Sequence, residues 1–177
     1  MLKFLAFDYM LTQFKDWHKE VAADSELFTD LSRLSVLKLL FFASAPKSEN
    51  DQTDLLDLFD NFHALPYGPV ESDIYNTIKG DLLPNYRVRE RGITIKNSEP
   101  DYHELESDIK NRIDTEIKEL KGANKNLILK SAFDLVEITH QWESWKSAFG
   151  FAQFLGKQSY EMTPDSIKKD RNKFFGS

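Results

Sequence analysis

The histidines are the first place to look for metal or acid–base chemistry. Four occur in 177 residues, at positions 18, 63, 103 and 140, and no two are four residues apart, the spacing that places two ligands on one helix face. The chain also contains no HExxH, GxSxG or GxGxxG segment. It has no cysteine, which excludes thiolate metal sites, disulfides and a cysteine nucleophile. We therefore expect no metal site, no cofactor and no catalytic residue.

A distinctive polar and aromatic cluster is Thr139-His140-Gln141-Trp142, which is followed by Trp145. Tryptophan beside polar groups is enriched in the centres of protein interfaces. Two interpretations stay open: His140 is a hydrogen-bonded core residue of its helix, or the cluster binds a partner. An alternative from another class is a small hydrolase of unknown substrate, in which His140 acts with Glu137 or Glu143.

The second distinctive segment is ALPYGPV, in which Pro66 and Pro69 bracket Tyr67 and Gly68. It predicts a rigid turn that projects the Tyr67 ring, with Gly68 as the N-cap of a helix that starts at Pro69 and ends near Lys79. The turn serves either to place that helix or to bind a partner. The candidate partner-binding residues of the two segments are Tyr67, Gly68, Pro69, Val70, Thr139, His140, Trp142 and Trp145.

The charge balance favours a protein partner over nucleic acid. Lysine and arginine total 23 against 29 acidic residues, a net charge of −6 that suits a basic protein and disfavours a phosphate backbone. The exceptions are the basic segment Tyr86–Lys96 and the basic C-terminal tail, which keep a nucleic-acid-binding regulator as an alternative. Since no zinc finger or RRM signature is present, we expect no nucleic acid partner for this chain by itself.

Apolar periodicity predicts the elements that must position these segments. Residues 3–22 are expected to form an amphipathic helix, and Ser32 to cap a helix that ends near Ser44. The segment 46–53 is expected to be a solvated loop, and 54–61 a helix with solvated acids. Residues 100–121 predict a long charged helix ended by Gly122. Its thin apolar seam packs within the domain or against a second copy, so a homo-oligomer stays open.

The second half of the chain predicts further helices. One is expected from Asn124 or Asn126 to about Trp145, and a last one over about 164–175, with an aromatic loop or short helix at 146–162. The alternating segment 86–96 predicts a hairpin. The expected fold class is a compact, mainly α single domain over residues 1–177 with a small β element in the middle.

The apolar run LSVLKLLFFASA predicts a buried helix rather than a targeting segment. It begins late in the chain, follows an acidic stretch and contains Lys38. No uncharged apolar segment approaches the roughly 18 residues of a membrane span. We therefore expect a cytoplasmic protein without a membrane partner.

Three segments, taken in order, resemble the Panacea (SocA-like) antitoxin domain. The segment 37–43 (LKLLFFA) matches a helix of the type LxKLLYFA, and 62–70 (FHALPYGPV) with Tyr75 matches an aromatic-x-Ala segment followed by a Gly-Pro-Val turn. Leu135, Ile138, Thr139, His140 and Trp145 stand at the places of a third motif. The resemblance covers about residues 30–150. Ser44-Ala45-Pro46 and Ser144 depart from the family pattern at positions where a partner surface could be tuned.

The resemblance implies a non-enzymatic antitoxin of a toxin–antitoxin system, which binds and neutralises a co-encoded protein toxin. Some similar proteins act as adaptors that deliver the toxin to an AAA+ protease, so that protease is a second implied partner. Members also occur in phages and mobile elements. The expected contact region is the turn 67–70 with His140, Trp142 and Trp145, and the acids between Glu49 and Asp60 are its expected rim.

Overall fold

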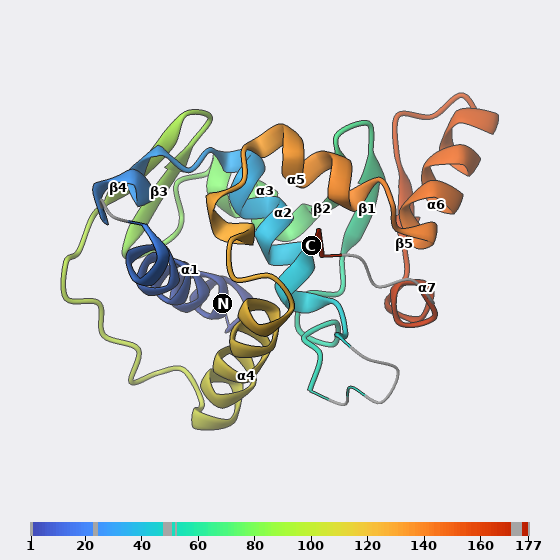
Figure 1. The fold of residues 1–177 in the computed structure, drawn as a ribbon. Coiled ribbons are helices and arrows are strands. Elements are labelled where there is room, and N and C mark those ends of the chain that lie inside the picture. The colour runs from blue at the N-terminus through green and yellow to red at the C-terminus, as the bar shows by residue number, and fades with distance from the viewer. Residues whose placement is uncertain (1, 23–24, 48–50, 52, 171–174, 177) are drawn as a thin grey trace.

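The computed structural model describes residues 2–22, 25–47, 51, 53–170 and 175–176, the side chains of 25–27 excepted. The chain is mainly helical with small antiparallel β elements in its middle, as expected (Figure 1). Its helical elements are α1 (Leu2–Val21), η1 (Ser25–Asp30), α2 (Arg33–Ser44), α3 (Ser72–Lys79), α4 (Ser107–Ala123), η2 (Leu127–Leu129), α5 (Ala132–Thr139), α6 (Glu143–Phe154) and α7 (Pro164–Lys168), where η marks 3₁₀ turns. The strands are β1 (Phe62–Leu65), β2 (Gly68–Glu71), β3 (Tyr86–Arg89), β4 (Gly92–Ile95) and β5 (Tyr160–Met162).

Helix α2 is the centre of the fold. Ser32 caps it as predicted, its side-chain oxygen accepting the N–H of Ser35. Every residue from Ser35 to Ser44 is buried, because α4, α5 and β2 pack around the helix. The buried apolar side chains form one contiguous core that includes α2. Lys38 is the single charged residue of this buried stretch.

Helix α1 confirms the first predicted helix, and it packs against α4. The apolar seam of α4 is buried within the protein, as expected. The helix begins at Ser107 rather than at Pro100. In the irregular segment before it, the Tyr102 hydroxyl donates to Oδ1 of Asp8 on α1 at 2.8 Å. Gly122 does not end α4, which continues to Ala123.

Strand β1 lies in the middle of a three-stranded antiparallel sheet of order β2-β1-β5. The helix expected from Pro69 is wrong at its start, since residues 68–71 pair with β1 as strand β2. Glu71, not Gly68, caps α3 by accepting the N–H of Ile74 at 2.7 Å. Strand β5 lies in the segment expected to be a loop or short helix. The predicted hairpin at 86–96 is confirmed as β3 and β4.

The helix expected from Asn124 or Asn126 to Trp145 is in fact three elements, η2, α5 and α6. Ser131 and Asp134 form a capping box that starts α5 anew, and a turn after Thr139 separates α5 from α6. Phe133 of α5 is 70% exposed, so the apolar residues of this segment do not share one buried face. The last helix, α7, begins after Thr163 as expected but ends at Lys168, and residues 171–174 lie outside the described part of the chain.

Residues 54–61 form a turn, not the predicted helix. The N–H groups of Leu58 and Phe59 both donate to the Leu55 carbonyl, so only one helical turn forms before the chain leads into β1. The acids of this segment pair with bases of other elements. These pairs are Asp57–Arg112, Asp54–Lys168 and Asp60–Lys3.

The preceding segment, 46–53, is not simply a solvated loop. The Lys47 side chain is buried, and its Nζ lies 2.6 Å from the buried Glu116 carboxylate. Residues 48–50 and 52 of this segment lie outside the described residues.

Candidate partner-binding site

The turn between β1 and β2 displays Tyr67 at its tip. Leu65 and Gly68 are the last pair of the hairpin, so Pro66 and Tyr67 form a two-residue connection. The Tyr67 side chain is exposed, with 61% of the residue's surface accessible. A rigid hairpin that presents an aromatic ring is a suitable anchor for a partner, because little conformational entropy is lost on binding.

Gly68 lets the hairpin approach α5 closely. Its φ of +88° is rarely adopted by residues with a side chain, and a Cβ there would lie 2.3 Å from Oγ1 of Thr139. Thr139 is fully buried, and its hydroxyl donates to the carbonyl of Val136 at 2.7 Å. A side chain at position 68 would therefore collide with the threonine at position 139.

Lys38 holds the hairpin from the side of α2. Its side chain is fully buried, and Nζ donates to the carbonyl of Pro69 at 2.6 Å. Burial lowers the pKa of the Lys38 ammonium to about 7. A single cationic residue in the apolar run 34–45 was the sequence signal for this contact, but the prediction of binding residues omitted Lys38.

His140 lies on the other side of the same hairpin. Its ring stacks on the Trp145 indole, with centroids 3.9 Å apart and planes 15° apart. The pKa of His140 is lowered, chiefly because the ring is partly buried, and the charge of Lys38 acts in the same direction. Glu137 and a hydrogen bond with the Pro66 backbone raise this pKa, but by less. His140 is therefore part of the support of the turn, with its side chain only partly accessible.

The two tryptophans differ in what they contact. Trp142 is fully buried and packs edge to face against Phe41 and Phe175, at centroid distances of 5.0 and 5.6 Å. Trp145 is 8% exposed, and its Nε1 donates to the Leu65 carbonyl at 3.0 Å. Of the predicted residues, Thr139 and Trp145 contact the hairpin and His140 stacks on Trp145, whereas Trp142 packs in the core. Their surface, however, is mainly Tyr67 and part of His140, with the others behind them.

The geometry around His140 does not form a catalytic pair with Glu137. The His140 Nδ1 lies 3.9 Å from Oε1 of Glu137, beyond hydrogen-bond distance, and the Glu137 side chain is exposed. Glu143 is instead bridged to Lys146 at 2.9 Å. The hydrolase alternative therefore gains no support from these contacts.

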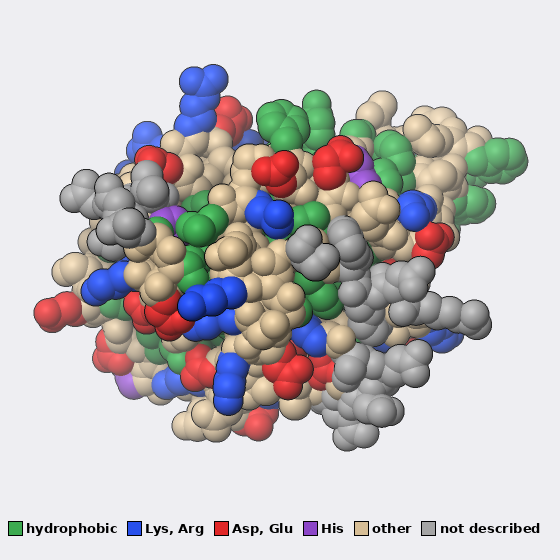
Figure 2. Space-filling model, viewed as in Figure 1, with side chains coloured by type: hydrophobic (Ala, Val, Ile, Leu, Met, Phe, Trp, Pro, Cys, Tyr) green, Lys and Arg blue, Asp and Glu red, His purple; other side chains and the backbone are tan. Residues whose placement is uncertain are grey.

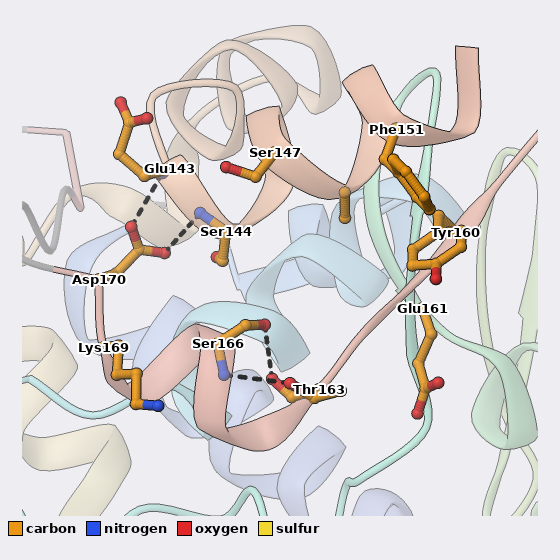
Figure 3. Close-up of a pocket in the computed structure, with 11 residues that line it drawn as sticks. Glu143, Ser144, Ser147, Phe151, Tyr160, Glu161, Thr163, Ser166, Lys169 and Asp170 are labelled. Atoms are coloured by element: carbon orange, nitrogen blue, oxygen red, sulfur yellow. Dashed lines mark hydrogen bonds between the residues drawn. The ribbon is translucent and has the colours of Figure 1, made fainter. Parts of the chain in front are cut away.

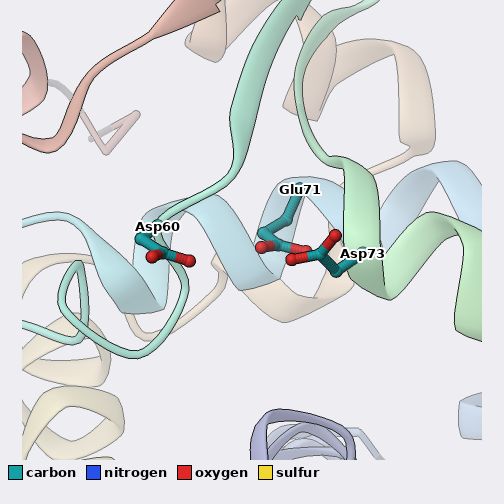
Figure 4. A group of neighbouring side chains, drawn as sticks. All are labelled: Asp60, Glu71 and Asp73. Atoms are coloured by element: carbon teal, nitrogen blue, oxygen red, sulfur yellow. The ribbon is translucent and has the colours of Figure 1, made fainter.

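An acidic group elsewhere is already occupied by a side chain. Asp60, Glu71 and Asp73 bring carboxylate oxygens within 4.8 Å of one another (Figure 4). Lys3 Nζ lies among them, at 2.7, 2.9 and 2.7 Å respectively. Burial opposes the charge on Lys3, but the hydrogen bonds to the three carboxylates outweigh it and raise the Lys3 pKa. The ammonium thus supplies the positive charge that a metal ion would bring.

The basic hairpin is partly neutralised. Arg87 and Lys96 both contact the Asp81 carboxylate, at 2.5 and 2.8 Å. Because Arg87 and Lys96 are paired with Asp81 of the same chain, they are less available to a phosphate backbone. This weakens the alternative of a nucleic-acid-binding hairpin.

Comparison with known proteins identifies the family. The family model described as antitoxin SocA-like, Panacea domain, matches residues 36–146, which include Lys38, the β1–β2 hairpin, Thr139, His140 and Trp145. Searches of curated proteins and of solved structures found no significant match. Among the described residues, none of the helices is long and apolar enough to cross a membrane. Because the match spans more than half of the chain and contains the whole cluster, the protein belongs to the SocA-like antitoxins of the Panacea domain family.

Proposed function

We propose that this protein is an antitoxin that binds and neutralises a co-encoded protein toxin in the cytoplasm, and that the Tyr67 turn is the centre of its contact surface. The observation that carries the proposal is the convergence of three family segments on one hairpin. Lys38 from α2, Thr139 from α5 and Trp145 from α6 all contact residues of the β1–β2 hairpin. The contacts of Lys38 and Thr139 are buried and that of Trp145 is partly buried, whereas Tyr67 is exposed.

The proposed site divides into a contact layer and a support layer. Tyr67 and the accessible part of His140 contact the toxin. Thr139 and Trp145 contact the hairpin and support it, and Gly68, Pro69 and Val70 are buried residues of the hairpin itself. Trp142 is a buried core residue that packs against Phe41 and Phe175. Preorganisation of this kind lowers the entropy lost on association. The net charge of −6 adds long-range attraction to a basic toxin, so association should slow as salt rises.

Co-expression with the product of the neighbouring open reading frame tests the function. The neighbour is induced alone and then together with this protein, and growth is measured. We expect toxicity that disappears on co-expression, with a complex recovered by pull-down. A neighbour that is harmless, or whose toxicity this protein does not relieve, would contradict the proposal.

A Tyr67→Ala variant tests the site. Truncating an exposed aromatic anchor should weaken toxin binding by about 2 kcal/mol, roughly 30-fold in Kd, with the melting temperature unchanged. Leu82→Ala is the control, because Leu82 is 65% exposed on a different part of the chain. Equal affinity of the Tyr67→Ala and Leu82→Ala variants would contradict the assignment of the turn.

The mode of neutralisation is either occlusion or delivery to a protease. We propose occlusion as the basic activity, because a rigid contact surface is sufficient for it. Measurement of the toxin's half-life in cells with and without an AAA+ protease separates the two modes. A half-life that shortens only when both antitoxin and protease are present would identify an adaptor.

A further inference from the structure

We propose that a groove between α6 and α7 binds a segment of the partner toxin that places an apolar side chain beside a lysine or arginine. This inference rests on the proposed antitoxin function and names a second contact surface for it. The groove has a volume of about 690 Å³ and lies over β5 (Figure 3). Among the candidate binding residues of the sequence analysis, none lines it.

One end of the groove is apolar and exposed. Phe151 of α6 and Tyr160 of β5 line it, with their rings edge to face at 4.7 Å, and they are 44% and 37% exposed. Beyond them, Phe154 and Leu155 at the end of α6 are 84% and 44% exposed. Figure 2 shows hydrophobic side chains gathered at this end of the molecule. Exposed apolar groups that adjoin a groove are typical of protein interaction sites.

The middle of the groove holds an unused hydrogen-bonding group. The Ser144 hydroxyl is buried and has no hydrogen-bond partner among the residues that the structure describes. In Figure 3 it points from α6 into the space toward α7. Asp170, by contrast, is engaged, since its carboxylate accepts the N–H groups of Glu143 and Ser144 at 2.9 and 3.0 Å. A buried hydroxyl without a partner is unfavourable, and a donor or acceptor of a bound segment would satisfy it only after a small shift of the groove wall, since the Ser144 oxygen has almost no accessible surface.

The charged residues that line the groove favour a bound segment that carries a positive charge. The lining contains three acidic residues, Glu143, Glu161 and Asp170, against the single base Lys169. Glu143 is bridged to Lys146 and Asp170 accepts two backbone N–H groups, so Glu161 is the acid on which attraction to a basic segment mainly rests. Glu161 is exposed beside the apolar end. A segment that combines an aromatic or aliphatic side chain with a lysine or arginine therefore complements both the apolar end and the acidic rim.

A second copy of this chain fits the groove less well than a basic partner does. In a two-fold dimer the same surface faces itself, which would place the acidic rim of one copy against that of the other. The net charge of −6 adds repulsion between copies and attraction to a basic toxin. The toxin is therefore the occupant that charge favours.

Two variants test the groove. Ser147 is exposed and lines the groove, so Ser147→Trp fills it, and Glu161→Lys reverses the charge of its rim. The matched controls are Asn111→Trp on α4 and Glu99→Lys, which change exposed residues elsewhere. With the neighbouring gene's product as probe, we expect Kd to rise about 30-fold for Ser147→Trp and about 10-fold for Glu161→Lys. The controls and all melting temperatures should match the wild type.

A second probe makes the result independent of the neighbouring gene. A displayed library of random peptides is selected on the wild-type protein and, in parallel, on the Ser147→Trp variant. We expect peptides with an aromatic or aliphatic residue next to lysine or arginine to be enriched on the wild type only. Equal enrichment on both proteins, or a consensus rich in acidic residues, would overturn the inference.

The outcomes separate the two proposals. A toxin that is neutralised equally by wild type and Ser147→Trp would refute the groove and leave the antitoxin function standing. A harmless neighbour together with groove-dependent peptide enrichment would refute the identified toxin and support the groove.

Discussion

Replacing Lys38 with methionine should stabilise the protein at neutral pH, and this gain should be lost by pH 10. The side chain is fully buried, and its amine contacts the Pro69 carbonyl. Its pKa falls from 10.5 to about 7 in the folded protein because burial disfavours the charged form. The unfolded chain therefore binds more protons than the folded chain between these two pH values. Stability of the wild type must rise with pH across that window.

The size of the effect follows from the two pKa values. Releasing the proton on folding at pH 7 costs about 4 kcal/mol, and at pH 10 only about 1 kcal/mol. Methionine removes this term but leaves the Pro69 carbonyl without its donor, which costs about 1–3 kcal/mol. The Lys38→Met variant should thus be about 1–3 kcal/mol more stable than the wild type at pH 7. At pH 10 the two should be equal, or the variant the less stable.

Urea unfolding at pH 7, 8, 9 and 10 measures this difference. Comparing the variant with the wild type at each pH removes the titration of the other groups. Lys118→Met, which changes an exposed residue of α4, is the control and should show no pH-dependent difference. A difference between Lys38→Met and the wild type that stays constant from pH 7 to pH 10 would refute the reasoning, since Lys38 would then not lose its proton on folding.

Three further substitutions probe the packing of the Tyr67 turn and of the core by thermal melting. Gly68→Ala should destabilise the protein by more than about 2 kcal/mol, because φ is positive at this position and because the new Cβ would clash with Thr139. Adding Thr139→Ala in the same chain should recover part of this loss. Strict additivity of the two changes would contradict the contact. Trp142→Ala should destabilise by about 3–5 kcal/mol because the indole fills the core between Phe41 and Phe175. An unchanged melting temperature would show that Trp142 is not a core residue.

The sequence predicted those elements that local signals define. Apolar periodicity located α1, the Ser32 cap located α2, and Thr163-Pro164 located the start of α7. It failed where long-range pairing decides the structure. Residues 160–162 become a strand because they pair with β1, and no local pattern reports a partner 100 residues away. Residues 68–71 pair with β1 through a two-residue connection, but their Gly-Pro start was interpreted as the beginning of a helix.

The candidate site was predictable as a set of residues but not as a surface. The family segments named Gly68, Thr139 and Trp145, and the structure brings them to one hairpin. Whether an aromatic ring faces solvent depends on packing between elements, so the sequence could not separate buried Trp142 from exposed Tyr67. The α6–α7 groove was missed because residues 146–162 were predicted only as an aromatic loop or short helix, without a packing partner.

The pairing of β1 with β5 also means that the sheet can be completed only late in synthesis. Phe62 pairs with Met162, so the ribosome must add 100 further residues after Phe62 before the sheet can close. At 5–20 residues per second this takes roughly 5–20 s. Trp145 and Thr139, which support the turn, also emerge late in that interval. A nascent chain therefore contains the Tyr67 turn long before the residues that support the turn have been synthesised. Only completed chains can present the turn in its folded position.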